Sequence, residues 1–202
     1  MSASDLRVVV ADIETKKLAS DVGGWDAMRA GKGGISVLVV WDSWSGRFHL
    51  YDESTLGTAA EHLEAADVLL SFNGEGFDVP VIEGMLGRRL CIKHHYDLLL
   101  LIWSAISGRR KGNTLGEVAQ RTLGAKKSGE SVLAPALYDQ GRFAELHDYA
   151  ISDVDLTRRL FRFVQEHGGV VGQDGNLLEL PLPELFRFID LGSLPRETVS
   201  GV

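Results

Sequence analysis

Two carboxylates directly follow an apolar stretch near the start of the chain. Asp12 and Glu14 come after the apolar residues 8–11 and are separated by Ile13. Because alternate residues of a strand share a face, both carboxylates project from one side while Ile13 points into the core. Two negative charges at the end of an apolar strand destabilise the fold unless a positive species lies between them. The pair therefore indicates a cation site, with an exposed pair of loop acids as the alternative.

A third carboxylate, Asp78, follows a second apolar stretch. "DVLLSF" (67–72) predicts a short buried strand, and the Gly-rich turn after it leads into a predicted helix that begins near Asp78. The connection from the first strand is long enough for the two strands to lie parallel and adjacent, which places their carboxyl ends together. Asp78 either joins the first pair or only complements the helix dipole. Asn73 and Phe77 at this spacing favour a site.

The fourth carboxylate lies on a long predicted helix, from about Phe143 to His167. Tyr149 and Asp153 are four residues apart and therefore share one helical face. Asp153 lies close to the apolar face, where a carboxylate without a partner is penalised. Asp148 and Asp155 are expected to be solvated, since their positions face elsewhere. Tyr149 and Asp153 are thus the residues of this helix that point to chemistry.

The four carboxylates share one property, which is that they offer only oxygen ligands. Oxygen ligands suit Mg²⁺ or Mn²⁺, and neither histidine nor cysteine stands among these positions to recruit zinc. Two divalent ions would offset the repulsion between the acids and would clamp the attacking and leaving oxygens of a phosphodiester. The sequence therefore predicts a site with two divalent metal ions, held by Asp12, Glu14, Asp78 and Asp153.

Strand-like and helix-like segments alternate along the 202 residues, which predicts one α/β domain. Their order is a strand, two hairpin strands, a helix, a strand, a helix, a short strand and then helices. This order predicts a mixed central sheet with helices on both faces. We expect a single domain over residues 1–190, with its core over about 6–167 and a C-terminal hairpin over about 170–181. Residues 191–202 are expected to form a flexible tail.

Composition predicts a cytoplasmic protein without membrane association. The sequence contains no apolar run long enough to span a bilayer, and residues 1–7 lack the basic-then-apolar pattern of a secretory signal. The single cysteine, Cys91, lies in "LCIK" (90–93), which predicts a short edge strand and a buried, inert thiol.

Charge is segregated along the chain. The net charge is −7, but residues 86–127 contain nine basic and two acidic residues, so this segment carries +7 and the remainder −14. Such segregation predicts a phosphate-contacting surface beside an acidic centre. A solvated basic loop is the alternative interpretation.

Three short motifs now resemble those of a known family. "DIET" (12–15), "FNGEGFD" (72–78) and "YAISD" (149–153) are similar to the three exonuclease motifs of the DEDD superfamily of 3′-5′ exonucleases, which has a ribonuclease H-like fold. The Tyr-x-x-x-Asp form of the third motif indicates the tyrosine branch. Over roughly residues 6–167 the chain is most similar to stand-alone relatives of the proofreading domain of family-B DNA polymerases.

The resemblance implies a role for each motif residue. Asp12 would bridge both metal ions, Glu14 and Asp153 would complete one site, and Asp78 would hold the second ion, partly through water. Tyr149 would orient the attacking water, because a phenol with an ordinary pKa of about 10 is a poor base at neutral pH. Asn73 would contact the terminal nucleotide or the waters of the second metal, and Phe77 would pack beside the last base.

Other residues are predicted to contact the substrate. Trp25 either stacks on a base or forms a hydrophobic lid, and basic residues after "SG" (107–108) would follow the strand backbone. The predicted substrate-binding residues are Thr15, Trp25, Asn73, Phe77, Arg109, Arg110 and Lys111.

The resulting hypothesis is a 3′-5′ exonuclease that removes nucleotides from the 3′ ends of single-stranded nucleic acid, with DNA favoured over RNA. One alternative is a catalytically weak accessory module that only binds nucleic acid. Another is a haloacid-dehalogenase-type phosphatase, because residues 8–15 have an apolar strand ending in two acids. That mechanism requires a second aspartate where Glu14 stands.

Overall fold

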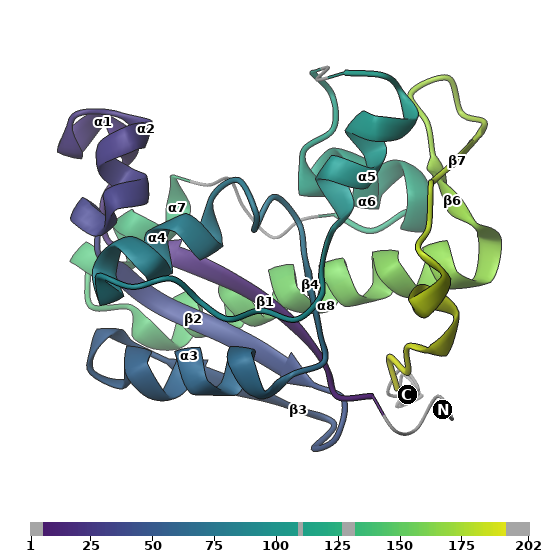
Figure 1. The fold of residues 1–202 in the computed structure, drawn as a ribbon. Coiled ribbons are helices and arrows are strands. Elements are labelled where there is room, and N and C mark those ends of the chain that lie inside the picture. Colours follow the sequence, from purple (N-terminus) through teal and green to yellow (C-terminus); the bar gives the residue numbers. More distant parts are fainter. Residues whose placement is uncertain (1–5, 109–110, 127–131, 193–202) are drawn as a thin grey trace, which may run out of the picture.

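A five-stranded mixed sheet forms the centre of the computed structural model, which describes residues 6–108, 111–126 and 132–192 (Figure 1). The strand order is β3-β2-β1-β4-β5. β1 pairs antiparallel with β2 and parallel with β4, while β3 is antiparallel to β2 and β5 is parallel to β4. The strands are β1 (Val8–Thr15), β2 (Ile35–Asp42), β3 (Arg47–Tyr51), β4 (Val68–Ser71) and β5 (His95–Asp97).

Helices cover both faces of this sheet, so the predicted mixed α/β architecture is confirmed (Figure 1). One face packs against α3 (Leu56–Ala65), α4 (Asp78–Leu86) and the irregular helical turn η2 (Met28–Lys32). The other face packs against α5 (Leu98–Ala105), α6 (Leu115–Leu123), α7 (Leu133–Asp139) and α8 (Phe143–His167).

The alternation of β1 decides which face receives the carboxylates. Val8 and Val10 belong to the core on the α8 side, and Val9 and Ile13 belong to the core on the α4 side. Asp12 follows the parity of Val8 and Val10, since successive side chains of a strand point to opposite faces. The strand thus directs its acids toward α8.

Smaller elements complete the fold. The short helices α1 (Ala19–Val22) and α2 (Trp25–Ala27) precede η2, and a 3-10 turn η3 (Glu53–Thr55) precedes α3. After α8, β6 (Gly169–Val171) and β7 (Leu177–Glu179) pair antiparallel within the segment predicted as a hairpin. A last turn, η4 (Glu184–Phe188), buries Phe186 against the core. Residues 193–202 lie outside the described residues.

Two glycines bring η2 into close contact with α4. A Cβ atom on Gly31 would lie 2.6 Å from Cγ of Met85, and one on Gly84 would lie 2.5 Å from the carbonyl oxygen of Arg29. Any larger residue at either position would push the two elements apart. The segment that carries α1 and α2 is therefore held directly on α4.

The expectation for residues 90–93 is wrong. Sheet pairing begins only at β5, and Cys91 is exposed and not buried. Its backbone N–H donates to Glu64 of α3, and the Leu90 N–H donates to Glu83 of α4. Because these carboxylates satisfy the backbone donors, the segment crosses the two helices without pairing as a strand.

Among the described residues, no helix combines the length and the apolar character that crossing a membrane requires.

Candidate metal centre and cleft

The carboxylates of Asp12 and Glu14 lie on β1, beyond the end of its parallel neighbour β4. Asp12 pairs with Val39 and Glu14 with Val37 of β2, and the register shifts between Glu14 and Thr15. Such an irregularity at the end of a strand reorients side chains beside a site. Both acids are half-buried and line a cavity of about 460 Å³.

Helix α8 supplies the third carboxylate to the same position. Asp153 is only 2% exposed, and its carboxylate lies with those of Asp12 and Glu14 so that one oxygen of each falls within 4.8 Å of the others. Tyr149 lies one turn earlier on the helix, is buried, and lines the same cavity. The structure thus brings together four of the five residues predicted to be catalytic, from two elements far apart in the sequence.

Asp78, the fifth, begins α4 and lies beside this cluster. It is 7% exposed and lines the cavity. Burial raises the pKa of Asp78 well above its ordinary value, and the nearby carboxylates of Asp12, Asp97 and Glu14 raise it further. A group so penalised for its charge is one that a bound cation would stabilise.

The turn that carries Asp78 is held by Asp97, whose wider role the sequence did not reveal. Asp97 is the N-cap of α5, where its side chain accepts hydrogen bonds from the backbone N–H groups of Leu99 and Leu100. Its carboxylate also accepts from the backbone N–H groups of Asn73, at 2.8 Å, and Glu75, at 3.0 Å. No local pattern signals these two contacts, which join residues more than 20 positions apart.

Backbone geometry in this turn depends on two residues. Asn73 adopts a left-handed conformation with φ of 68°, which asparagine tolerates better than most residues. A Cβ on Gly74 would lie 2.5 Å from Oγ of Ser71 and 3.0 Å from Oδ2 of Asp78. Glycine at this position therefore lets the turn approach the acid closely.

Most of the predicted substrate-binding residues line the cavity, which we call the cleft. They are Thr15, Trp25, Asn73, Phe77 and Lys111. Arg109 and Arg110 lie outside the described residues. Thr15 directs its hydroxyl to the carbonyl oxygen of Lys17 at 2.9 Å. Trp103, Asn113 and Thr114 also line the cleft and were not among the predicted site residues.

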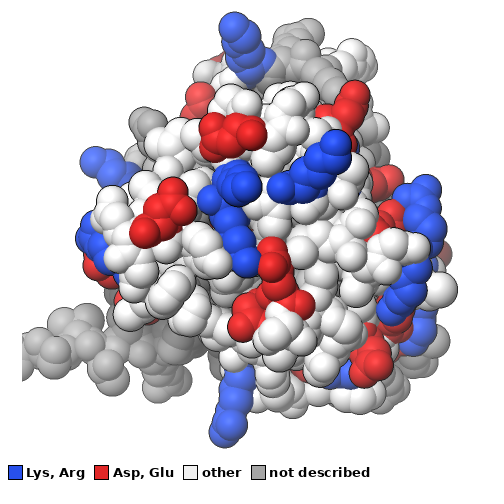
Figure 2. Space-filling model, turned by 90° about the vertical axis from the view of Figure 1, so that its left-hand side faces the viewer, with Lys and Arg blue, Asp and Glu red and all other residues white. Residues whose placement is uncertain are grey.

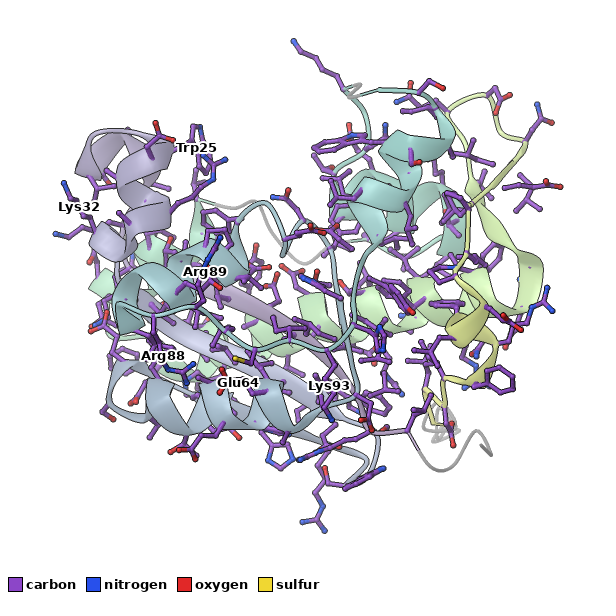
Figure 3. All side chains as sticks on the ribbon, viewed as in Figure 1. Trp25, Lys32, Glu64, Arg88, Arg89 and Lys93 are labelled. Carbon is purple, nitrogen blue, oxygen red and sulfur yellow. The ribbon has the colours of Figure 1, made fainter. Side chains whose placement is uncertain are left out.

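Two aromatic side chains form one rim of the cleft. Trp25 is 61% exposed and meets Phe77 edge to face, with ring centroids 5.9 Å apart. In Figure 3, Trp25 projects from the α1–α2 region on the side that faces α5 and α6. Arg29 fixes this region to the turn below by donating to the carbonyl oxygen of Gly76 at 3.0 Å.

The basic segment of residues 86–127 does not form one continuous phosphate-binding surface in the part of the chain that the structure describes. Arg88 pairs with Glu64, Arg89 with Glu83, and Lys93 with Asp67. Figure 3 places Arg88 beside Glu64 on the α3–α4 side. On the face that Figure 2 presents, basic and acidic side chains are interspersed. Among the described basic residues of this segment, Lys111 is the one that lines the cleft.

The donor set of the cleft fits hard divalent cations. None of the described residues that line it is a histidine or a cysteine, and its four carboxylates offer oxygen ligands alone. Mg²⁺ and Mn²⁺ prefer such ligands. The proximity of Asp12, Glu14 and Asp153 supplies a compact ligand group, with Asp78 beside it.

The comparison with protein families agrees with this arrangement, in which a carboxylate cluster lies at the end of the central strand of a mixed sheet. A family model of the RNase H superfamily matches residues 10–162. The chain therefore belongs to the RNase H superfamily, and the predicted ribonuclease H-like fold is confirmed. No curated protein matches the sequence. Membership supports a nuclease-type function on nucleic acid with divalent metals, and leaves the phosphatase alternative without support.

One similar solved structure is the family B DNA polymerase from the hyperthermophilic archaeon Pyrobaculum calidifontis. The TM-score is 0.57 at 17% identity, over 92% of this chain and 27% of the polymerase chain. At this identity the likeness concerns the fold alone. The chain thus corresponds in fold to a limited part of that much longer polymerase.

Proposed function

We propose that this protein is a metal-dependent 3′-5′ exonuclease of the DEDD type that shortens single-stranded nucleic acid, with DNA favoured over RNA. The observation that carries the proposal is the convergence of Asp12, Glu14 and Asp153 within 4.8 Å, with Tyr149 and Asp78 lining the same cleft. The three motif resemblances supply the direction of digestion. A cytoplasmic location stays a prediction.

The four carboxylates would hold two divalent ions, which supply Lewis-acid activation of water and of the scissile phosphate when bound. Asp12 would bridge the two sites, Glu14 and Asp153 would complete one, and Asp78 would serve the other. Tyr149, fixed by its burial on α8, would orient the attacking water toward the phosphorus. The half-enclosed cleft would hold the terminal nucleotide against the acids.

The aromatic rim favours a single strand over a duplex as substrate. Trp25 and Phe77 present ring surfaces at the cleft, and unpaired bases stack on such rings without regard to sequence. Asn73, fixed in the turn by Asp97, would contact the terminal nucleotide. These residues would place the last phosphodiester bond over the carboxylates.

Digestion of end-labelled oligonucleotides tests this function. With 5′-labelled single-stranded DNA and Mg²⁺ or Mn²⁺, we expect a ladder that shortens one nucleotide at a time, while 3′-labelled DNA releases labelled mononucleotide at once. Asp12→Ala and Asp153→Ala should abolish digestion, and Asp148→Ala, an exposed acid of the same helix, should not. Activity that persists in EDTA would contradict the metal mechanism, and parallel RNA and duplex substrates rank the polymers.

A further inference from the structure

Arg121, in the last turn of α6, holds the chain segment that forms the wall of the cleft opposite the aromatic rim. Its Nη1 donates to the carbonyl oxygen of Gly112 at 2.6 Å, and its Nη2 donates to the side-chain oxygen of Asn113. Its Nε donates to the carbonyl oxygen of Val171 in β6 at 2.7 Å. One planar guanidinium thus ties three separate segments together, which its fixed fork of donors suits.

The segment that Arg121 holds, residues 111–114, lines the cleft throughout. Its far end is anchored by the capping box of α6, in which Thr114 and Glu117 exchange hydrogen bonds. Its near end is anchored by Gln173 of the β6–β7 hairpin, whose Nε2 donates to the carbonyl oxygen of Lys111 at 2.6 Å. We call residues 111–114 the clamped loop.

Close packing against the hairpin also restricts the clamped loop. Gly112 has φ of +82°, and a Cβ on it would lie 2.5 Å from Nε2 of Gln173. The loop therefore follows a path that favours glycine, directly against Gln173. Its position depends on contacts outside the loop, which Arg121 and Gln173 supply.

Charge gives the clamped loop its importance for binding. One side of the cleft is acidic, so an approaching phosphodiester strand is repelled there until cations neutralise it. Lys111, on the clamped loop, and Lys17, after β1, are the described lysines that line the cleft. Lys111 is exposed, and it lines the same cleft as the acids. Its attraction for a phosphate depends on where the loop places it.

We propose that Arg121 is a positioning residue that fixes the clamped loop as the strand-binding wall of the cleft, with Gln173 as its second anchor. This proposal rests on the proposed function and assigns Arg121 no contact with the substrate. Arg121 belongs to the basic segment of the sequence, yet its donors are directed at carbonyl and amide oxygens of the protein and not at solvent phosphates.

The test measures KM and kcat on a single-stranded oligonucleotide with Mn²⁺ for Arg121→Gln and Gln173→Ala. We expect KM to rise about tenfold in Arg121→Gln, because hydrogen bonds from a charged group are lost, with kcat changed less than about twofold. The KM of Arg121→Lys should lie between those of the wild type and Arg121→Gln, since an ammonium group keeps the charge but lacks the planar fork of donors. Arg162→Gln is the matched control, because Arg162 also donates to a backbone carbonyl, that of Gly192, away from the cleft.

A double-mutant cycle separates positioning from a general loss of structure. If Arg121 acts through the clamped loop, Arg121→Gln should raise KM much less in a Lys111→Ala background than in the wild type. Gln173 is exposed, so Gln173→Ala keeps the test open if Arg121→Gln unfolds the protein. An unchanged KM in folded Arg121→Gln or Gln173→Ala, or fully additive effects with Lys111→Ala, would overturn the proposal.

A binding measurement distinguishes the failure of this proposal from the failure of the proposed function. If the wild type digests no oligonucleotide with any metal, the exonuclease proposal fails. Fluorescence anisotropy of a labelled oligonucleotide with Ca²⁺ then still measures how the clamped loop affects binding. Weaker binding by Arg121→Gln and Gln173→Ala than by the wild type and Arg162→Gln supports the positioning role, and equal binding overturns it.

Discussion

The carboxylate of Asp97 accepts a hydrogen bond of 2.8 Å from the backbone N–H of Asn73. This contact joins the start of α5 to the turn from which Asn73 and Asp78 reach the cleft. A buried carboxylate with four backbone donors fixes the turn more firmly than neutral acceptors would. The position of the second acidic motif is thus set from a neighbouring strand and helix.

Asp97→Asn should destabilise the protein and weaken metal binding together. The amide nitrogen of the variant cannot accept from the Glu75 N–H, so a partly buried donor loses its partner, at a cost of about 1 kcal/mol in the free energy of unfolding. Urea unfolding and Mn²⁺ titration measure the two effects. Asp148→Asn, on the exposed side of α8, is the control. Unchanged Mn²⁺ affinity would show that the turn holds its shape without Asp97.

Asp78→Asn should raise the thermal stability of the metal-free protein at neutral pH while reducing activity by on the order of 10²–10³-fold. Burial and the nearby acids raise the pKa of Asp78 in the fold. A raised pKa gives stability that is fully present below the ordinary pKa and is lost as the pH rises through the raised value. The amide of the variant stays neutral at every pH, so the variant does not lose this stability as the pH rises.

Thermal melts in EDTA between pH 5 and pH 8 check this expectation. The melting temperature of the wild type should fall toward pH 8 more than that of Asp78→Asn, and Mn²⁺ should stabilise the wild type more than the variant. A variant that is less stable than the wild type in EDTA at pH 8 would mean that Asp78 is not penalised for its charge.

Asp42 should contribute stability that is lost in acid. Burial alone would raise its pKa, but hydrogen bonds from Arg7 and His62 lower the pKa of Asp42 to about 2. A lowered pKa gives stability that is present above the ordinary value of 3.8 and disappears as the pH falls through about 2. The shift corresponds to about 2 kcal/mol, as Asp42 is 2% exposed.

Chemical unfolding of the wild type and Asp42→Asn at pH 6, 4 and 2.5 measures this contribution. We expect the difference in free energy of unfolding between them to shrink toward pH 2.5. A difference that is constant with pH would attribute the effect of the substitution to packing instead of charge.

Trp25→Ala should weaken binding of single-stranded oligonucleotides by about 1–3 kcal/mol if the ring stacks on a base. Trp44→Ala is a close control, because Trp44 is 65% exposed against 61% for Trp25 but lies on the β2–β3 turn. Anisotropy titrations with Ca²⁺ give the two affinities. Equal binding by both variants and the wild type would favour a lid role for Trp25.

Sequence periodicity was sufficient for the elements that carry the acids. Val8, Val10 and Asp12 share one face of β1 because a strand alternates, and Tyr149 and Asp153 share one face of α8 because a helix repeats. Helix α8 has the predicted bounds, Phe143–His167. These patterns involve residues close together in the chain, and they can therefore be recognised in the sequence alone.

Contacts between distant residues explain what the sequence could not predict. In the sequence, nothing next to Arg88 indicates a partner, and only the fold brings Glu64, 24 positions away, beside it. The same holds for Arg121, whose partners Gly112 and Val171 belong to two other segments. Cys91 was placed wrongly for a related reason, since backbone donors near it bind carboxylates of α3 and α4 instead of a strand.

The contact of Gly31 with α4 has a mechanical consequence. The Trp25 rim and α4 form one rigid side of the cleft, because the packed backbones of η2 and α4 leave no room for one to slide along the other. The clamped loop, in contrast, is attached through side-chain hydrogen bonds. We expect the rigid side to keep its position in Arg121→Gln and Gln173→Ala, which release only the clamped loop. If the proposed function holds, this rigid side limits how wide a terminal nucleotide the cleft accepts.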